Sequence, residues 1–204
     1  MNRPQAILLL GPTGSGKTPL GECLAARGLR GRPCAHFDFG RQLRDVTAAD
    51  PPPAGFSREE VDFLRDVLER GALLENRHFP LAEKILRAFL AERAAPGSLI
   101  ILNGLPRHVD QARDAARLLD VGEVVVLHCP PQVVLERIAS DAGGDRAGRM
   151  DDSEAAVRAK LELFAQRTAP LVEYYRAAGA AVRTVEVGPA TTPDDVLAAL
   201  NAVC

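Results

Sequence analysis

Short apolar runs alternate along the chain with longer segments in which apolar positions recur at helical spacing. Five such runs lie at residues 6–10, 34–38, 99–102, 124–128 and 182–187. Apolar runs of this length, separated by helical segments, are typical of a parallel sheet flanked by helices. The hydrophobic pattern therefore predicts an α/β fold with a five-stranded parallel sheet.

Two helices are predicted between the second and third runs. Residues 57–60 read Ser-Arg-Glu-Glu, a capping box that opens a helix with apolar residues at helical spacing up to Gly71. A second helix is expected to begin near Pro80, and three consecutive prolines at 51–53 precede both helices. We expect residues 39–94 to form a helical insertion that covers a binding site.

Prolines also mark the helices of the C-terminal third. The helical pattern from Ser153 to Tyr175 contains Pro170, whose missing N–H should kink or break the helix. Thr192 and Pro193 provide the start of a further helix, because proline fits the first helical position. The sequence therefore predicts a broken helix before the last strand and one more helix after it.

Length and composition limit the classes of function. A chain of 204 residues, 47% apolar and 25% charged, suits one globular domain. The formal net charge of −2 gives no case for nucleic acid or an anionic membrane as partner. The N-terminal apolar run is too short for a signal peptide or a membrane span. We expect a cytoplasmic monomer that contacts no membrane.

Cysteine spacing gives no metal-binding motif. Cys23, Cys34, Cys129 and Cys204 are widely dispersed, without the paired spacing of a zinc site or a redox dithiol. We therefore expect no structural zinc.

The first apolar run leads directly into a phosphate-binding loop. Its residues are Gly11, Pro12, Thr13, Gly14, Ser15, Gly16, Lys17 and Thr18. In such a loop, backbone N–H groups and the N-terminus of the next helix bind phosphate oxygens. Lys17 is expected to reach the β- and γ-phosphates, and the Thr18 hydroxyl to bind Mg²⁺. The loop predicts a protein that binds ATP with Mg²⁺.

Arginines follow the predicted strands at points that face this loop. Arg107 ends the segment Asn103-Gly104-Leu105-Pro106-Arg107 after the third run, at the edge where open α/β sheets place ligands. Arg44 lies one short helix beyond the second run, and a glycine-punctuated segment with further arginines follows Arg137. Phosphoryl transfer depends on alignment and on neutralising charge, which arginines on separate elements suit. We expect a kinase with a short lid at residues 138–152.

The order of these motifs resembles the adenylate kinase and nucleoside monophosphate kinase family along nearly the whole chain. Residues 40–44 resemble the short helix with the monophosphate-binding arginine, and residues 103–107 resemble the Asp-Gly-aromatic-Pro-Arg signature. Residues 148–152 resemble the end of a short lid. The resemblance implies a single P-loop kinase domain over residues 1–204 with strand order 2-3-1-4-5. It also implies transfer of the γ-phosphoryl group of MgATP to a nucleoside monophosphate.

The resemblance assigns roles to single residues by position. Catalytic roles fall on Lys17, Arg107, Arg137, Arg149 and Lys160, and Arg137 joins the phosphate loop in binding ATP. The acceptor is assigned to Phe39, Gly40, Arg44, Leu73, Leu74, Gly104, Arg107, Gln111, Arg149 and Lys160. Mg²⁺ is assigned to Thr18, with Asn103 or Asp38 acting through water. Gln111 falls where adenylate kinases read the base, which favours AMP as the acceptor.

Several positions depart from the family's pattern. Asn103 replaces the signature aspartate, and Asp141 replaces a lid arginine, for which Arg146 is a candidate substitute. Lys160 replaces an arginine and keeps the charge without the bidentate fork. Phe39 replaces a small hydroxyl residue beside the acceptor base. These changes bear on catalytic efficiency and on the choice of acceptor.

Two other functions stay open. In a kinase for a small metabolite, Asp38 at the end of the second run would orient or deprotonate the acceptor alcohol. The substitutions at Asn103 and Asp141 also fit a protein that binds ATP without turnover. Against the first, Arg44, Arg107 and Gln111 together favour the monophosphate kinase. Against the second stand the intact phosphate-contacting residues Lys17, Thr18, Arg44, Arg107 and Arg149.

Overall fold

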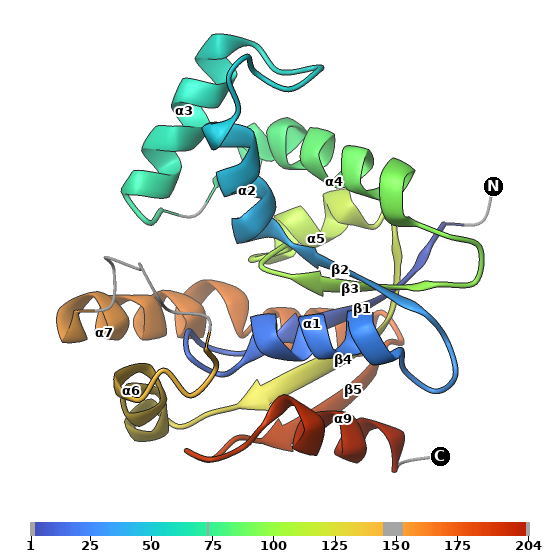
Figure 1. Cartoon of the computed structure of the whole chain (residues 1–204), viewed down its shortest axis with the longest axis vertical. Helices are drawn as coiled ribbons and strands as arrows, with labels where there is room; N and C mark the ends of the chain where they lie inside the picture. The colour runs from blue at the N-terminus through green and yellow to red at the C-terminus, as the bar shows by residue number, and fades with distance from the viewer. Residues whose placement is uncertain (1–2, 73, 145–152, 203–204) are drawn as a thin grey trace.

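The computed structural model describes the whole chain except residues 1–2, 73, 145–152 and 203–204. Within this part, five parallel strands form one sheet in the order β2-β3-β1-β4-β5, which confirms the predicted order (Figure 1). The strands are β1 (Gln5–Leu10), β2 (Cys34–Asp38), β3 (Leu99–Asn103), β4 (Asp120–His128) and β5 (Ala181–Glu186). β4 begins earlier than predicted because Asp120 and Val121 pair with the start of β1.

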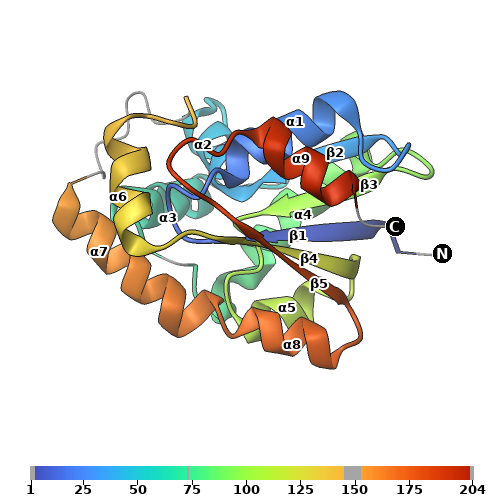
Figure 2. The ribbon, with the colours of Figure 1, turned by 90° about the horizontal axis from the view of Figure 1, so that it is seen from below.

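Helices cover both faces of the sheet. Side chains alternate along β1, so Ile7 and Leu9 enter one buried cluster and Leu8 and Leu10 the other. The first cluster is covered by α1 (Lys17–Arg27), α6 (Pro131–Ala139) and α9 (Pro193–Asn201), the second by α4 (Phe79–Arg93), α5 (Val109–Ala115) and α8 (Leu171–Ala177). Figure 2 shows α1 and α9 on one side of the sheet and α5 and α8 on the other. None of the described helices is both long and apolar enough to cross a membrane.

Most of the connection between β2 and β3 is helical. Its elements are α2 (Phe39–Ala48), α3 (Arg58–Glu69), the 3₁₀ turn η1 (Asn76–His78) and α4. The predicted capping box is present, since Ser57 Oγ accepts a hydrogen bond from the Glu60 N–H and Glu60 Oε2 accepts one from the Ser57 N–H. Lys84 of α4 pairs with the Glu60 carboxylate at 2.6 Å. The cap of α3 is thereby tied to α4.

The predicted break near Pro170 is confirmed. Helix α7 (Glu154–Leu163) is followed by a π-helical turn, η2 (Phe164–Thr168), and Pro170 precedes α8. Turns of this kind are rare and are frequent at functional sites. The last helix, α9, starts at Pro193 with a capping box from Thr192, as predicted.

Candidate functional site

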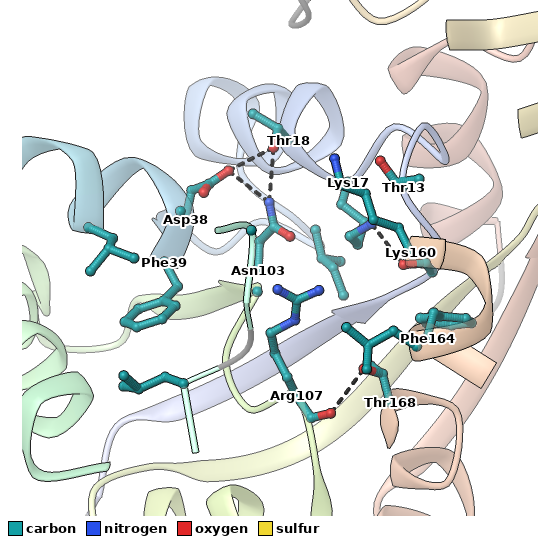
Figure 3. Close-up of a pocket in the computed structure, with 18 of the residues that line it drawn as sticks. Thr13, Lys17, Thr18, Asp38, Phe39, Asn103, Arg107, Lys160, Phe164 and Thr168 are labelled. Atoms are coloured by element: carbon teal, nitrogen blue, oxygen red, sulfur yellow. Dashed lines mark hydrogen bonds between the residues drawn. The ribbon is translucent and has the colours of Figure 1, made fainter. Parts of the chain in front are cut away.

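A cavity of about 300 Å³ opens at the carboxyl ends of β1, β2 and β3 (Figure 3). Its walls come from the loop after β1, the start of α2, the segment between α3 and η1, the segment after β3, and α7 with the π turn. Open α/β sheets bind ligands at this edge. The predicted residues that line it are Gly11, Thr13, Gly14, Gly16, Lys17, Thr18, Asp38, Phe39, Gly40, Arg44, Leu74, Asn103, Gly104, Arg107, Gln111 and Lys160.

The phosphate loop prepares the start of α1 for an anion. Gly14 and Gly16 adopt φ angles of 74° and 89°, a left-handed backbone that glycine takes without strain. Gly16 is the N-cap of α1, and no side chain caps the first N–H groups of this helix. Those N–H groups and the positive end of the helix dipole favour a phosphate. Ser15 is buried, and its hydroxyl donates to the Pro12 carbonyl at 2.9 Å, which holds the loop.

Lys17 folds its side chain back over this loop. Its Nζ donates to the carbonyl oxygens of Gly11 and Pro12 at 2.8 and 2.7 Å. Lys17 also lines the cavity. A phosphate oxygen that enters carries more negative charge than a carbonyl, so it competes well for the ammonium group.

Thr18, Asp38 and Asn103 form a hydrogen-bonded triangle at the carboxyl ends of β2 and β3 (Figure 3). The Thr18 hydroxyl donates to Asp38 Oδ2 at 2.7 Å. Asn103 Nδ2 donates to the same Asp38 oxygen at 2.9 Å and to Thr18 Oγ1 at 3.1 Å. Asp38 and Asn103 are paired residues in the β2–β3 register, which places their side chains next to one another.

Arg44 and Arg107 bring two guanidinium groups to the cavity. Across the residues that the structure describes, neither guanidinium has a hydrogen bond or an ion pair. The protein around Arg107 lowers the pKa of its guanidinium by desolvation, but arginine keeps its charge at neutral pH. Its backbone is fixed, since Thr168 Oγ1 donates to the Arg107 carbonyl at 2.9 Å. Two guanidinium groups that make no ion pair within the described residues are suited to an anionic ligand.

An apolar wall stands beside these arginines. It consists of Phe39, Leu43, Val67, Leu68 and Leu74, which come from α2, α3 and the segment after α3. Phe39 packs near Phe37 of β2, with ring centroids 6.2 Å apart. This side of the cavity therefore combines an apolar surface with positive charge.

Gln111 is almost fully buried and uses both ends of its amide on the backbone. Its Oε1 accepts from the Arg107 N–H at 2.9 Å, and its Nε2 donates to the Leu74 carbonyl at 2.7 Å. One N–H and one lone pair of the amide remain for a ligand. Gln111 thus fixes the backbone on two sides of the cavity, and its predicted contact with the base rests on the remaining N–H and lone pair.

Arg137 lies behind the phosphate loop. Its Nε donates to the Gly14 carbonyl at 3.1 Å, and one terminal nitrogen donates to the carbonyls of Gly188, Pro189 and Thr191. The residue is buried and does not line the main cavity. These contacts join the phosphate loop to the segment before α9. The predicted contact of Arg137 with ATP phosphates stays a prediction.

The remaining predicted residues are placed unevenly. Lys160 projects from α7 and lines the cavity on the side opposite Phe39 of the apolar wall (Figure 3). Asp141 lies just after α6 with a positive φ of 47°. Leu73, Arg146 and Arg149 lie outside the described residues, together with most of the predicted lid.

The oxygen atoms beside the phosphate loop suit an Mg²⁺ ion that is bound together with a triphosphate. They suit less well a metal ion that is held by protein side chains alone. Within the described part of the chain, no three or more His, Cys, Asp or Glu residues form a group that could hold a metal ion. Mg²⁺ usually takes one or two protein oxygens together with substrate phosphates and water. The Thr18 hydroxyl, with Asp38 beside it, provides such oxygens next to the phosphate loop.

Part of the cavity wall was not anticipated from the sequence. Leu43, Val67, Leu68, Leu163 and Phe164 line the cavity without having been assigned to it. Their signal is present but weak, because apolar residues at helical spacing more often mark a core than a ligand wall.

The fold and this loop define the class of protein. A family model described as an AAA domain matches residues 7–158. A gluconokinase from Sinorhizobium meliloti superposes with a TM-score of 0.53 at 22% identity, covering 99% of this chain and 92% of that one. At this identity the likeness shows the fold alone. Because the matched residues include the phosphate loop, the protein belongs to the class of P-loop nucleotide-binding proteins.

Sequence relatives give the family. The chain is 34% identical to an adenylate kinase of Thermus thermophilus over 208 residues, covering 99% of this chain and 98% of the relative. It is 33% identical over 181 residues to an adenylate kinase of a Synechococcus strain, covering 86% of each protein. The chain therefore belongs to the adenylate kinase and nucleoside monophosphate kinase family.

Proposed function

We propose that this protein is a nucleoside monophosphate kinase that transfers the γ-phosphoryl group of MgATP to a monophosphate, with AMP as its preferred acceptor. The observation that carries the proposal is the pair of guanidinium groups, Arg44 and Arg107, in a cavity that also holds the phosphate loop. A kinase for uncharged alcohols has no use for two cations at the acceptor position. An acceptor that already carries a phosphate needs them.

The apolar wall supports a nucleotide as that acceptor. Phe39, Val67 and Leu74 offer the flat face of a base an apolar surface. Gln111, with one N–H and one lone pair remaining, offers the base edge one donor and one acceptor. The adenine edge presents both a donor and an acceptor, which matches this amide. The two relatives described above are both named adenylate kinase, which points the same way.

The transfer needs no covalent intermediate on the protein. A phosphate oxygen of the acceptor attacks the γ-phosphorus, the bond from that phosphorus to the β–γ bridging oxygen breaks, and ADP leaves with the electron pair. Arg107 and Lys17 stabilise charge on the acceptor and on the transferred group, while Lys160 and Arg149 are assigned to the same task. Mg²⁺, bound by Thr18 with Asp38 or Asn103 through water, would neutralise the β- and γ-phosphates.

A metabolite kinase that uses Asp38 as a base fits the geometry less well. Asp38 Oδ1 accepts from the Arg41 N–H at 3.0 Å as the N-cap of α2, and Oδ2 accepts from Thr18 and Asn103. Both oxygens therefore have partners, which hold the carboxylate toward the phosphate loop rather than toward an acceptor alcohol.

The test is ADP formation from MgATP with AMP, CMP, UMP, GMP or dTMP as acceptor and with none. We expect turnover with AMP above the other acceptors, and none in the Lys17→Met variant, which controls for contaminating kinases. Silence across the panel in a protein that still binds ATP would overturn the proposal. It would favour either a metabolite acceptor or a protein that binds ATP without turnover.

A further inference from the structure

The acid that the family signature places at the end of β3 is replaced here by an amide, Asn103, and a carboxylate stands on the neighbouring strand. Asp38 is the register partner of Asn103 across the β2–β3 pair. Asn103 Nδ2 and Asp38 Oδ2 are 2.9 Å apart. A carboxylate at either of these two positions therefore lies at the same edge of the sheet, beside Thr18 of the phosphate loop.

The hydrogen bonds orient the Thr18 hydroxyl for a cation. Its proton is donated to Asp38 Oδ2, and one of its lone pairs accepts from Asn103 Nδ2. A hydroxyl oxygen has two lone pairs, so one lone pair of Thr18 remains. A proton directed at a carboxylate leaves that lone pair free to point at a cation. Asp38 thus both places the hydroxyl and brings a negative charge beside it.

Asn103 turns the donor end of its amide toward Thr18 and Asp38. Its Nδ2 donates to both, so the end of the amide beside Thr18 cannot bind Mg²⁺, and its Oδ1 is a neutral acceptor without the negative charge of a carboxylate. The second oxygen of Asp38 caps α2, so the carboxylate is held from both ends. Asp38 is therefore fixed in position by β2, α2 and Asn103 together.

We infer that Asp38 supplies the carboxylate for the Mg²⁺ of bound ATP, in place of the missing acid on β3, and that Asn103 is a positioning residue for Asp38. The inference rests on the proposed binding of MgATP, but not on the identity of the acceptor. It commits to one of the two residues that sequence reasoning left as alternatives for the metal.

An exchange of the two residues tests it. The variants are Asp38→Asn, Asn103→Asp and the double exchange, which moves the carboxylate back to β3 and the amide to β2. Asn is as good an N-cap as Asp, so Asp38→Asn should keep α2. Asp45→Asn, an exposed change on the same helix, is the matched control for loss of a negative charge.

The readout is the gain in ATP affinity that Mg²⁺ provides, measured by calorimetric titration of ATP in Mg²⁺ and in EDTA. We expect the gain in ATP affinity from Mg²⁺ to be at least about tenfold smaller in Asp38→Asn than in the wild type. ATP affinity in EDTA should stay the same or improve, because a nearby negative charge is removed. The double exchange should restore the gain to within about threefold of the wild type, since the two positions are adjacent in register. Asp45→Asn should leave the gain unchanged.

Two results would overturn the inference: an unchanged Mg²⁺ gain in Asp38→Asn, or a double exchange no better than Asp38→Asn alone. Because no acceptor is present, failure of the proposed kinase activity leaves this test intact. A wild-type protein that does not bind ATP at all would end both proposals, and the titration in EDTA shows that directly.

Discussion

Lys17 supplies the positive charge nearest to the phosphate loop, and its contacts set what its removal should do. Its ammonium is held by the carbonyls of Gly11 and Pro12 in a preorganised position. Removing one preorganised charge from a transition state costs about a hundredfold or more in rate. We expect Lys17→Met to lower the turnover number by at least that factor in a coupled assay of ADP formation.

The matched control for this change is Lys84→Met. Lys84 lies in α4 and pairs with Glu60, away from the cavity. Its variant should keep the wild-type turnover number. Near-normal turnover in Lys17→Met, with the melting temperature unchanged, would remove Lys17 from the mechanism.

Arg107 should act on the acceptor rather than on ATP. Its side chain reaches into the cavity, while its backbone is held by Thr168 and Gln111, so a change of side chain leaves the local fold in place. Loss of a charge-assisted hydrogen bond costs about 1.5–3 kcal/mol, which is about tenfold or more in binding. We expect Arg107→Ala to raise the KM for AMP by at least about tenfold, with the KM for ATP within about twofold.

Two companion variants sharpen this prediction. Arg107→Lys should recover only part of the loss, because lysine keeps the charge without the bidentate fork. Arg113→Ala removes an exposed arginine of α5 that pairs with Asp110, and it should change neither KM. An Arg107→Ala enzyme with the wild-type KM for AMP and wild-type turnover would contradict the assigned role.

At the scale of single residues, the sequence predicted well which residues line the cavity. It predicted less well which hydrogen bonds those residues make. The loop was found because its spacing follows from how a backbone binds phosphate. The two arginines were found because they follow predicted strands at the ligand-binding edge and match motifs of the family. The contacts of Arg137 with the segment 188–191 were not predicted, because they join residues far apart in the chain. The same holds for Gln111, whose amide is bonded to backbone from two different elements.

At the scale of elements, α1 packs closely against β2 at Gly21. A Cβ on Gly21 of α1 would lie 2.2 Å from Nε2 of His36, a buried nitrogen that has no hydrogen-bond partner in the described structure. We expect Gly21→Ala to lower the free energy of unfolding by about 1–3 kcal/mol, because the overlap outweighs the better helix propensity of alanine. Urea unfolding measures this change.

The effect of Gly21→Ala on the free energy of unfolding should change sign when the His36 imidazole is absent. In a His36→Ala background, Gly21→Ala meets no ring and should stabilise the protein by up to about 1 kcal/mol through helix propensity. Equal destabilisation in both backgrounds would show that the contact with His36 is not the cause.

The elements themselves were largely predictable, since their signals are local. The capping boxes at Ser57 and Thr192 and the break at Pro170 depend on neighbouring residues alone. The π turn at Phe164–Thr168 was missed, because no local signal distinguishes it from a continuous helix and its Thr168 contacts the distant Arg107. The early start of β4 was missed for the same reason, since it depends on pairing with β1.

At the scale of the whole molecule, the cavity lies where the helical connection between β2 and β3 meets the π turn after α7, at the carboxyl edge of the sheet. Arg167 of the π turn pairs with Glu75 beside η1 at 3.4 Å, and Gln111 holds the Leu74 carbonyl. These contacts join the apolar wall of the cavity to the rest of the protein. Formation of the site is therefore coupled to folding. Conditions that lower the free energy of unfolding should also disrupt the site.

Acidification is one such condition, because His108 is buried and the half-buried His36 has a buried Nε2. The pKa of His36 is lowered, mainly by desolvation. The carboxylates of Asp38 and Glu22 oppose this shift, and the positive charge of Arg41 adds to it. Desolvation likewise lowers the pKa of His108, and Arg167 adds to this, while the Leu74 backbone, Asp110 and Glu75 oppose it. Both imidazoles are therefore held neutral in the folded state at pH values where an unfolded histidine, with a pKa of about 6.5, takes up a proton.

The sign of the effect follows from proton linkage. Above pH about 6.5 both states are neutral at these histidines, and below it the unfolded state binds more protons, so stability falls as the pH drops. We expect the urea midpoint to decrease from pH 7.5 to 5.5, and the decrease to be smaller in His36→Gln. The carboxylates whose pKa values are lowered, Glu59, Glu60 and Asp195, act at more acidic pH and stay outside this window. A midpoint that rises on acidification, or a His36→Gln protein with the full decrease, would show that the burial of His36 does not control this dependence.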